Sequence, residues 1–120
     1  MAKLYQQKIM RHYQQPQNRG KLKSADLVFL GNNPFCGDQV KIYLKLDKAK
    51  KIKEVGWEGA GCVISQASMS LFSQMLHGKT LAQAQKIKSE KIIKELGIKL
   101  SPTRLKCALL PLYAVKEQAS

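Results

Sequence analysis

The feature that most constrains the fold is a change of hydrophobic period near the middle of the chain. Between residues 38 and 46 an apolar residue occupies every second position, at Val40, Ile42, Leu44 and Leu46. A period of two is typical of a β-strand with one buried face. After Gly61 the period becomes that of a helix, with the stripe Ile64, Ala67, Ser68, Leu71, Phe72 and Met75. We therefore expect a long helix that packs on a sheet.

Shorter patterns before this point predict one helix and two more strands. An amphipathic helix ends before Pro16. An apolar run at residues 27–30 indicates a strand before the alternating one, and a weaker strand with Ile52, Val55 and Trp57 follows it. The connections between the strands are too short for helical crossovers, so we expect an antiparallel sheet.

The C-terminal part of the chain predicts only helices. Thr80 and Ser89 are typical N-caps of two short helices, and a last helix begins at Ser101 and bends or restarts at Pro111. The order of elements predicts a single α+β domain over residues 1–120. In this fold a three-stranded antiparallel sheet carries helices on one face.

The charge of the chain is strongly skewed, since 21 Lys and Arg against 8 Asp and Glu give a formal net charge of +13. Such a chain attracts phosphate, so we expect non-specific binding to nucleic acid, and a basic nucleic-acid-binding module is a remote alternative function. Aromatic residues are only 7% of the chain and no recognition motif is present, which argues against specific binding.

Neither a membrane anchor nor a signal peptide is predicted. Residues 59–78 carry no charge, but serine, glutamine and histidine are spread through them, so we expect a buried helix rather than a membrane span. Residues 1–12 contain no apolar stretch of the secretory type. The sequence predicts a cytoplasmic protein with no membrane partner, whose thiols are reduced or metal-bound.

Three cysteines, an odd number, cannot form a closed disulfide framework. Cys36 lies in a sharp loop, and Gly37 lets the backbone turn so that Cys36 and Asp38 converge. Cys62 begins the long helix, where free N–H groups and the helix dipole favour a thiolate. Cys107 lies near the start of the last helix, off its apolar stripe. Three thiolates and one carboxylate form a four-coordinate set for zinc or for iron of an iron–sulfur cluster.

Two interpretations in which the cysteines carry out no chemistry stay open. Free cysteines are often buried and inert, and a zinc ion can serve only to hold a fold together. A cysteine hydrolase is a weaker alternative, because His12 and His77 are the only histidines and neither has a recognisable partner pattern. We interpret His12 as a helix-face residue and His77 as a helix C-cap residue.

Three motifs surround the cysteines: Asn33-Pro34-x-Cys36-Gly37-Asp38, Gly59-x-Gly61-Cys62-x-Ile64-Ser65-x-Ala67-Ser68-x-Ser70 and Arg104-x-x-Cys107-Ala108-x-Leu110. In this order they resemble the IscU/SufU/NifU N-terminal family, whose members are scaffold and sulfur-acceptor proteins of iron–sulfur cluster assembly. The likeness extends over nearly the whole chain. It implies an α+β fold in which Cys36, Asp38, Cys62 and Cys107 are grouped at one end.

The resemblance also implies a function and a set of partners. Such a protein holds a transient [2Fe–2S] cluster or a zinc ion, accepts sulfur from a cysteine desulfurase and supplies apo iron–sulfur acceptor proteins. It is a scaffold rather than a classical enzyme, and the alternative is a zinc-dependent sulfurtransferase shuttle that activates the desulfurase. In the Isc branch a His precedes the third cysteine, whereas this chain has Lys106, a setting closer to SufU. The segment between Cys62 and Cys107 nevertheless lacks the insertion typical of SufU.

Chemistry then suggests a role for each residue. A persulfide acceptor needs thiolate character and exposure, and Cys107, flanked by Arg104 and Lys106, is the candidate acceptor. The same two cations would offset the charge of four anionic ligands, so together with Gly37 they are candidates for the layer around the metal. Asp38 is the candidate labile ligand, because a carboxylate binds iron–sulfide iron more weakly than a thiolate does.

Overall fold

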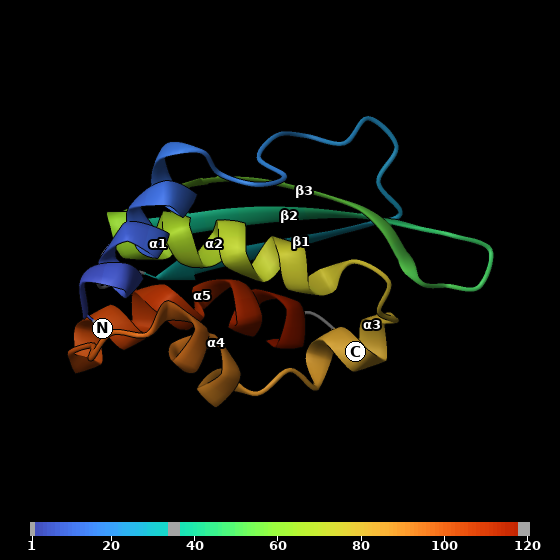
Figure 1. The fold of residues 1–120 in the computed structure, drawn as a ribbon. Coiled ribbons are helices and arrows are strands. Elements are labelled where there is room, and N and C mark those ends of the chain that lie inside the picture. Colours follow the sequence, from blue (N-terminus) through green and yellow to red (C-terminus); the bar gives the residue numbers. More distant parts are fainter. Residues whose placement is uncertain (1, 34–36, 118–120) are drawn as a thin grey trace.

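The computed structural model describes residues 2–33 and 37–117 of the chain (Figure 1). The elements in order are α1 (Ala2–Gln14), β1 (Leu27–Asn33), β2 (Asp38–Leu46), β3 (Ile52–Ala60), α2 (Val63–Leu76), α3 (Leu81–Gln85), α4 (Ser89–Leu96) and α5 (Pro102–Glu117). The strands form one antiparallel sheet in the order β1-β2-β3, and the helices gather on one side of it (Figure 1). The predicted fold class is confirmed.

The helices form layers over one face of the sheet. α2 packs on β3 and α5 packs on β1 and β2, while α1 covers α2 and α4 covers α5. Residues 15–26 pass along the other side of the sheet (Figure 1). This segment also pairs with β3, since the Gly20 N–H donates to the Trp57 carbonyl at 2.7 Å. The sheet edge at β3 is thereby protected.

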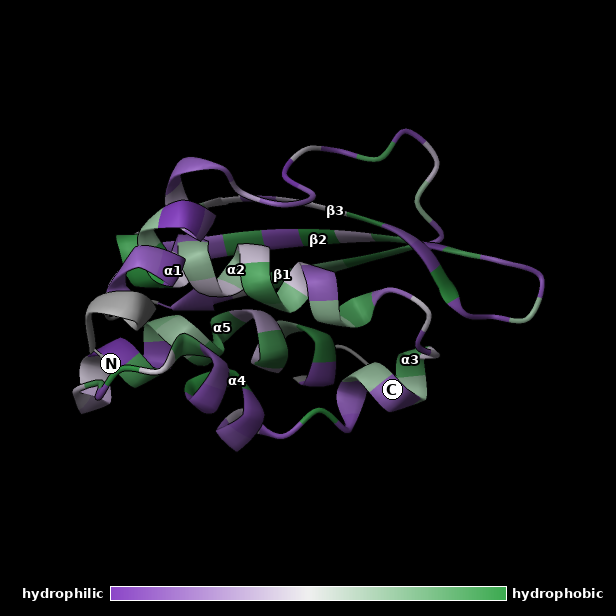
Figure 2. Cartoon of the chain, viewed as in Figure 1, coloured by the Kyte–Doolittle hydropathy of each residue, from purple (hydrophilic) through white to green (hydrophobic). Residues whose placement is uncertain are grey.

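The alternation along β2 decides which face is covered. Ile42 stands opposite Phe29 of β1 and Trp57 of β3, and all three are buried under the helices. Lys41 and Lys45 belong to the opposite face, and the alternating colours of the strands show the same pattern (Figure 2). Apolar residues line up on α2 and α5, whereas α4 is mostly polar on its outer side (Figure 2). The prediction of a half-buried strand is confirmed.

Several boundaries differ from the prediction. β1 extends to Asn33 and β3 to Ala60, because β2 supplies backbone pairing partners as far as these residues. Thr80 caps α3 with a full capping box, as predicted, but α4 has Lys88 rather than Ser89 as its N-cap. The Lys88 carbonyl already accepts the first backbone bond of that turn, so Ser89 lies inside the helix. α5 continues through Pro111 without a restart.

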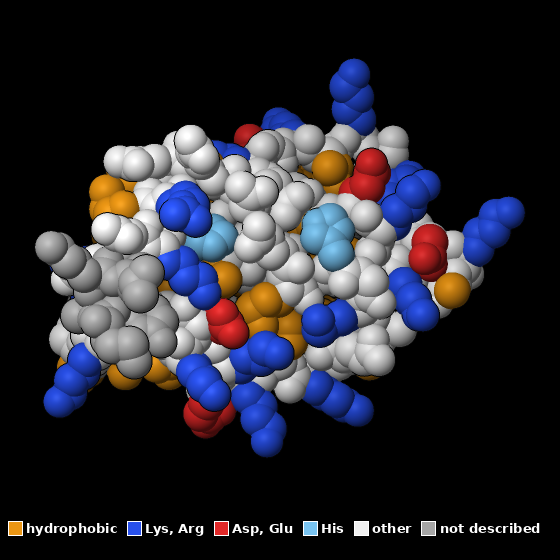
Figure 3. Space-filling view, viewed as in Figure 1, with side chains coloured by type: hydrophobic (Ala, Val, Ile, Leu, Met, Phe, Trp, Pro, Cys, Tyr) orange, Lys and Arg blue, Asp and Glu red, His pale blue; other side chains and the backbone are white. Residues whose placement is uncertain are grey.

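The described surface is dominated by cations. Lys and Arg side chains are spread over and around the face seen in Figure 3, with few Asp and Glu among them. In the part of the chain that the structure describes, no helix has the length and apolar character needed to cross a bilayer.

Candidate metal centre

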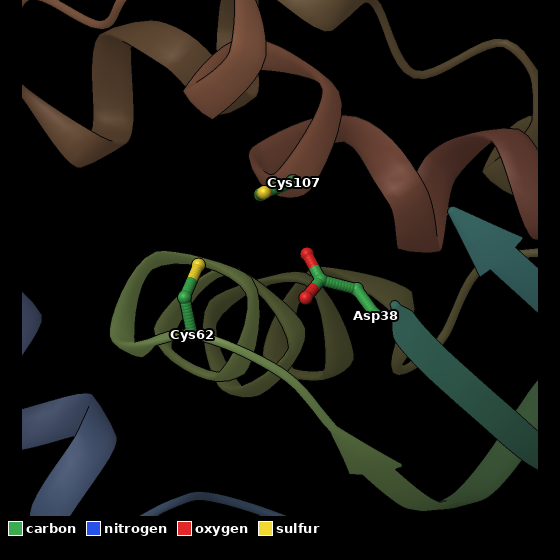
Figure 4. Close-up of side chains that lie close together, drawn as sticks. All are labelled: Asp38, Cys62 and Cys107. Carbon is green, nitrogen blue, oxygen red and sulfur yellow. The ribbon is translucent and has the colours of Figure 1, made fainter. Parts of the chain in front are cut away.

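Three segments that are distant in the sequence meet at one end of the sheet. Asp38 is the first residue of β2, Cys62 is the N-cap of α2, and Cys107 lies in the second turn of α5. One carboxylate oxygen and the two sulfurs all lie within 4.8 Å of one another. Their side chains point toward a common space (Figure 4). Cys36, the fourth predicted ligand, lies outside the described residues.

Asp38 occupies an unusual environment for a carboxylate. It is only 2% exposed, and its Oδ2 has no hydrogen-bond partner among the residues that the structure describes. A buried acceptor without a partner costs free energy, and a bound cation is one of the groups that can compensate this cost. The position of Asp38 at the end of a central strand holds its carboxylate next to the two sulfurs.

Gly61 makes room for this carboxylate. A Cβ at Gly61 would lie 2.7 Å from Asp38 Oδ1 and 2.3 Å from Ser65 Oγ, closer than real Cβ contacts. The glycine is therefore required by close approach rather than by a left-handed backbone. Gly37, on the other side of Asp38, has a φ of +72° and donates its N–H to the Asn33 carbonyl, so the predicted turn is confirmed.

Cys62 is held by the start of α2. Its backbone is extended, with φ −74° and ψ 172°, and its side chain makes no capping bond. The Cys62 carbonyl accepts a bond from Ser65 Oγ at 3.0 Å and one from the Gln66 N–H at 3.1 Å. The backbone is thus fixed while the half-buried sulfur faces the site, beside the positive end of the helix dipole.

Cys107 differs from the expectation. It is buried, at 2% exposure, and belongs to the hydrophobic core, so the prediction that it lies off the apolar stripe and is exposed is wrong. The reason is that α5 is covered by the sheet, by α2 and by α4, which buries more than one stripe of the helix. Arg104, one turn before Cys107, and Lys106, next to it, are exposed.

The donor set suits a soft metal. Two thiol sulfurs and a carboxylate oxygen are ligands that zinc accepts, and thiolates are the usual ligands of iron–sulfur clusters. The unpartnered Asp38 Oδ2 and the space that Gly61 leaves beside it agree with a bound cation. The described part of the chain therefore supplies three candidate ligands.

Three supporting residues, Gly61, Ser65 and Ser68, belong to the second cysteine motif, but the sequence alone assigned them no role in the site. A signal for the serines was available, because polar residues on an otherwise buried helix need hydrogen-bond partners. Ser65 bonds the Cys62 carbonyl, and Ser68 bonds the carbonyl of Ala108, next to Cys107. Gly61 was marked only by its place in the motif, and its role depends on contacts with Asp38 that the sequence does not show.

The fold and the site define a class: α+β proteins in which cysteines and an aspartate from separate elements meet at one end of the sheet as candidate metal ligands. The model of the family described as NifU-like N terminal domain matches residues 4–120. The chain belongs to this family.

Relatives and a solved structure show the same similarity. The chain is 35% identical to "Iron-sulfur cluster assembly enzyme IscU" of Drosophila melanogaster, over 94% of this chain and 74% of that protein. It is 33% identical to "Zinc-dependent sulfurtransferase SufU" of Bacillus subtilis strain 168, over 95% of this chain and 88% of that one. The crystal structure of FiSufU from Fervidobacterium islandicum AW-1 matches with a TM-score of 0.74 and 32% identity, covering 92% of each chain.

Proposed function

We propose that this protein is a scaffold of iron–sulfur cluster assembly, which accepts sulfur from a cysteine desulfurase, holds a [2Fe–2S] cluster transiently and passes it to acceptor proteins. The main support is the convergence of Asp38, Cys62 and Cys107, with a buried carboxylate oxygen that has no partner among the described residues. The names of the relatives, one an IscU and one a SufU, agree with this assignment.

The ligand set suits a cluster that has to be bound and then released. Thiolates of Cys62 and Cys107, with Cys36 as the third, bind iron strongly, whereas the Asp38 carboxylate is harder and exchanges more easily. Arg104 and Lys106 lie on α5 near Cys107 and reduce the negative charge of the loaded site.

Cys107 is the proposed acceptor of sulfur. Its thiolate attacks the terminal sulfur of the desulfurase persulfide, the S–S bond of that persulfide breaks, and the desulfurase cysteine leaves as a thiolate. The sulfur then remains on Cys107 as a persulfide. Because Cys107 is 2% exposed, the desulfurase has to bring its persulfide in among Asp38, Cys62 and Cys107 rather than to the outer surface.

A zinc-dependent sulfurtransferase is the second candidate. Lys106 favours it, since the Isc-type proteins that the chain resembles have a histidine there. Asp38, Cys62 and Cys107 would hold the zinc ion, which would keep the thiolates deprotonated. Both candidates use the same residues and the same desulfurase, so they differ in the metal and in the product.

Anaerobic purification followed by metal and sulfide analysis tests the proposal. We expect iron and acid-labile sulfide together after incubation with desulfurase, cysteine and ferrous iron. Zinc alone, with faster desulfurase turnover, would support the second candidate instead. Mass spectrometry after desulfurase treatment should locate the added sulfur atom on Cys107.

Single substitutions distinguish loss of the metal site from loss of the fold. The variants Cys62→Ser and Cys107→Ser should each fail to hold the cluster. The control Val63→Ser, which places a serine beside Cys62 at the start of α2, should hold it. Wild-type protein that binds neither iron with sulfide nor zinc would refute both candidates.

A further inference from the structure

A buried hydrogen bond joins α2 and α5, the helices that carry Cys62 and Cys107. The Ser68 hydroxyl donates a hydrogen bond to the backbone carbonyl of Ala108, the residue that follows Cys107. Ser68 and Ala108 are both completely buried, at 0% exposure. Such a bond from a short side chain to the backbone of another helix requires the two helices to lie very close, which small residues at both positions permit.

The turn of α5 at this contact lacks one backbone hydrogen bond of a regular helix. Pro111 lies inside the helix and has no N–H, so it cannot donate the usual helical bond to the carbonyl four residues earlier, at Cys107. A helix that lacks an internal bond bends more easily. The bond from Ser68 acts on the adjacent carbonyl, in the same turn, and ties that turn to α2 instead.

We propose that Ser68 is a positioning residue for the metal centre: through its bond to Ala108 it sets the separation of the Cys62 and Cys107 sulfurs. The inference rests on the proposed function, because it assigns a role within the same site. Ser68 is not one of the three candidate ligands. It acts by fixing the turn that carries Cys107 against the helix that begins at Cys62.

The alternative is that the Ser68 bond only provides a partner for a buried hydroxyl and has no effect on the site. Ser73 supplies a matched control. It is on the same helix and also 0% exposed, but its hydroxyl donates to the Ser70 carbonyl at 2.6 Å and accepts a bond from Asn18, away from α5. Ser73→Ala therefore removes a buried hydroxyl bond without loosening the contact between α2 and α5.

The test measures metal binding by metal-free protein. Zinc affinity is determined by competition with a chelator, and the absorption bands of the cobalt-substituted protein report the thiolate geometry. Ser68→Ala should lower zinc affinity about 10- to 100-fold, the range found when groups that orient ligands are removed, and should change the cobalt spectrum. Ser73→Ala should leave both unchanged, although both variants melt at lower temperature than the wild type. Ser68→Thr, which keeps the hydroxyl, should bind nearly as well as the wild type.

Wild-type affinity and spectrum in Ser68→Ala would overturn the inference, as would equal losses in Ser68→Ala and Ser73→Ala. If Ser68→Ala does not fold without metal, the pair Ser68→Thr and Ser68→Val decides, because the two side chains have the same shape and differ only in the hydroxyl. Equal affinities in that pair contradict the inference. Failure of the wild type to bind zinc, cobalt or a cluster would instead refute the proposed function.

Discussion

Asp38 is buried, and its Oδ2 has no hydrogen-bond partner within residues 2–33 and 37–117. Most buried carboxylates are paired or fully hydrogen-bonded, since isolated charge in the protein interior is costly. Here the neighbours are two sulfurs and a glycine that leaves space beside the carboxylate. A bound cation at this position would compensate the cost of burying the carboxylate.

We expect Asp38→Ala to prolong the life of the bound cluster and to slow its transfer to an acceptor protein, by about tenfold, the lower end of the effects seen when a metal's surroundings change. The physical reason is that the weakest ligand, whose exchange opens the site, is removed. Cluster absorbance followed over time in the presence and absence of an apo acceptor gives both rates. Glu54→Ala, an exposed acid on β3, is the control. An unchanged cluster lifetime would show that Asp38 is not the labile ligand.

Gly61→Ala should lower the zinc affinity as well as the free energy of unfolding. The added methyl group would overlap Asp38 and Ser65, so the carboxylate has to move, at a cost of about 1–3 kcal/mol in the free energy of unfolding. Gly56→Ala is a matched control, since its Cβ would lie 2.5 Å from the Gly20 carbonyl, on β3 away from the site. Chelator competition and urea unfolding distinguish the two variants. Equal zinc affinities would contradict the role given to Gly61.

Among the elements, α1 makes polar contacts with α2 in addition to placing Ile9 in the hydrophobic core. His12 Nδ1 lies 2.7 Å from Ser70 Oγ, which also accepts a bond from the Gln17 N–H at 2.8 Å. Lys8 forms an ion pair with Glu95 of α4 at 2.9 Å, and this partner holds the pKa of Glu95 below its usual value. The exposed ion pair contributes little, so the half-buried His12 contact is the more sensitive point of this helix.

The docking of α1 should therefore depend on pH. Burial, aided by the positive charges of Lys8 and Arg11, lowers the pKa of His12 from 6.5. Below pH 6.5 the unfolded chain binds this proton and the folded protein does not, so the free energy of unfolding falls as the pH falls. The slope is at most about 1.4 kcal/mol per pH unit for one group, and it ends below the lowered pKa.

Urea unfolding just above and just below pH 6.5 measures this slope. His12→Gln, which cannot titrate but can still bond to Ser70, should remove most of it. Glu95 titrates in a more acidic range, near or below its ordinary 4.5, and does not contribute in this window. Stability that is constant or that rises toward acid pH in the wild type would contradict the assignment to His12.

For the whole molecule the net charge of +13 is the dominant property. On the face seen in Figure 3 the Lys and Arg side chains are scattered rather than gathered in one groove. A dispersed charge of this kind attracts polyanions without reading their sequence. It is compatible with a scaffold function at one end of the sheet.

We expect binding to DNA to be equally tight for unrelated sequences and to weaken steeply with salt, by about 10³-fold or more between about 50 and 200 mM if six or more phosphates are contacted. Filter binding with two unrelated duplexes over a salt series provides the measurement. A clear preference for one sequence that persists at high salt would indicate a specific nucleic-acid function.

Local periodicity was sufficient to predict the secondary structure and the fold class. The alternation along β2 and the helical stripe of α2 each require burial of one face, and the short connections leave an antiparallel sheet as the solution. The identity of the candidate ligands Asp38, Cys62 and Cys107 was also predictable, because metal chemistry limits the residue types that can serve.

Tertiary structure decided how these residues are arranged. The burial of Cys107, the space that Gly61 leaves beside Asp38 and the bond from Ser68 to Ala108 all arise between segments distant in the sequence. The hydrophobic period indicates only that a residue is buried in the core, and it does not identify the residues that it contacts there. Contacts of this kind exist only once the sheet and both helices have packed, and so only the folded chain determines them.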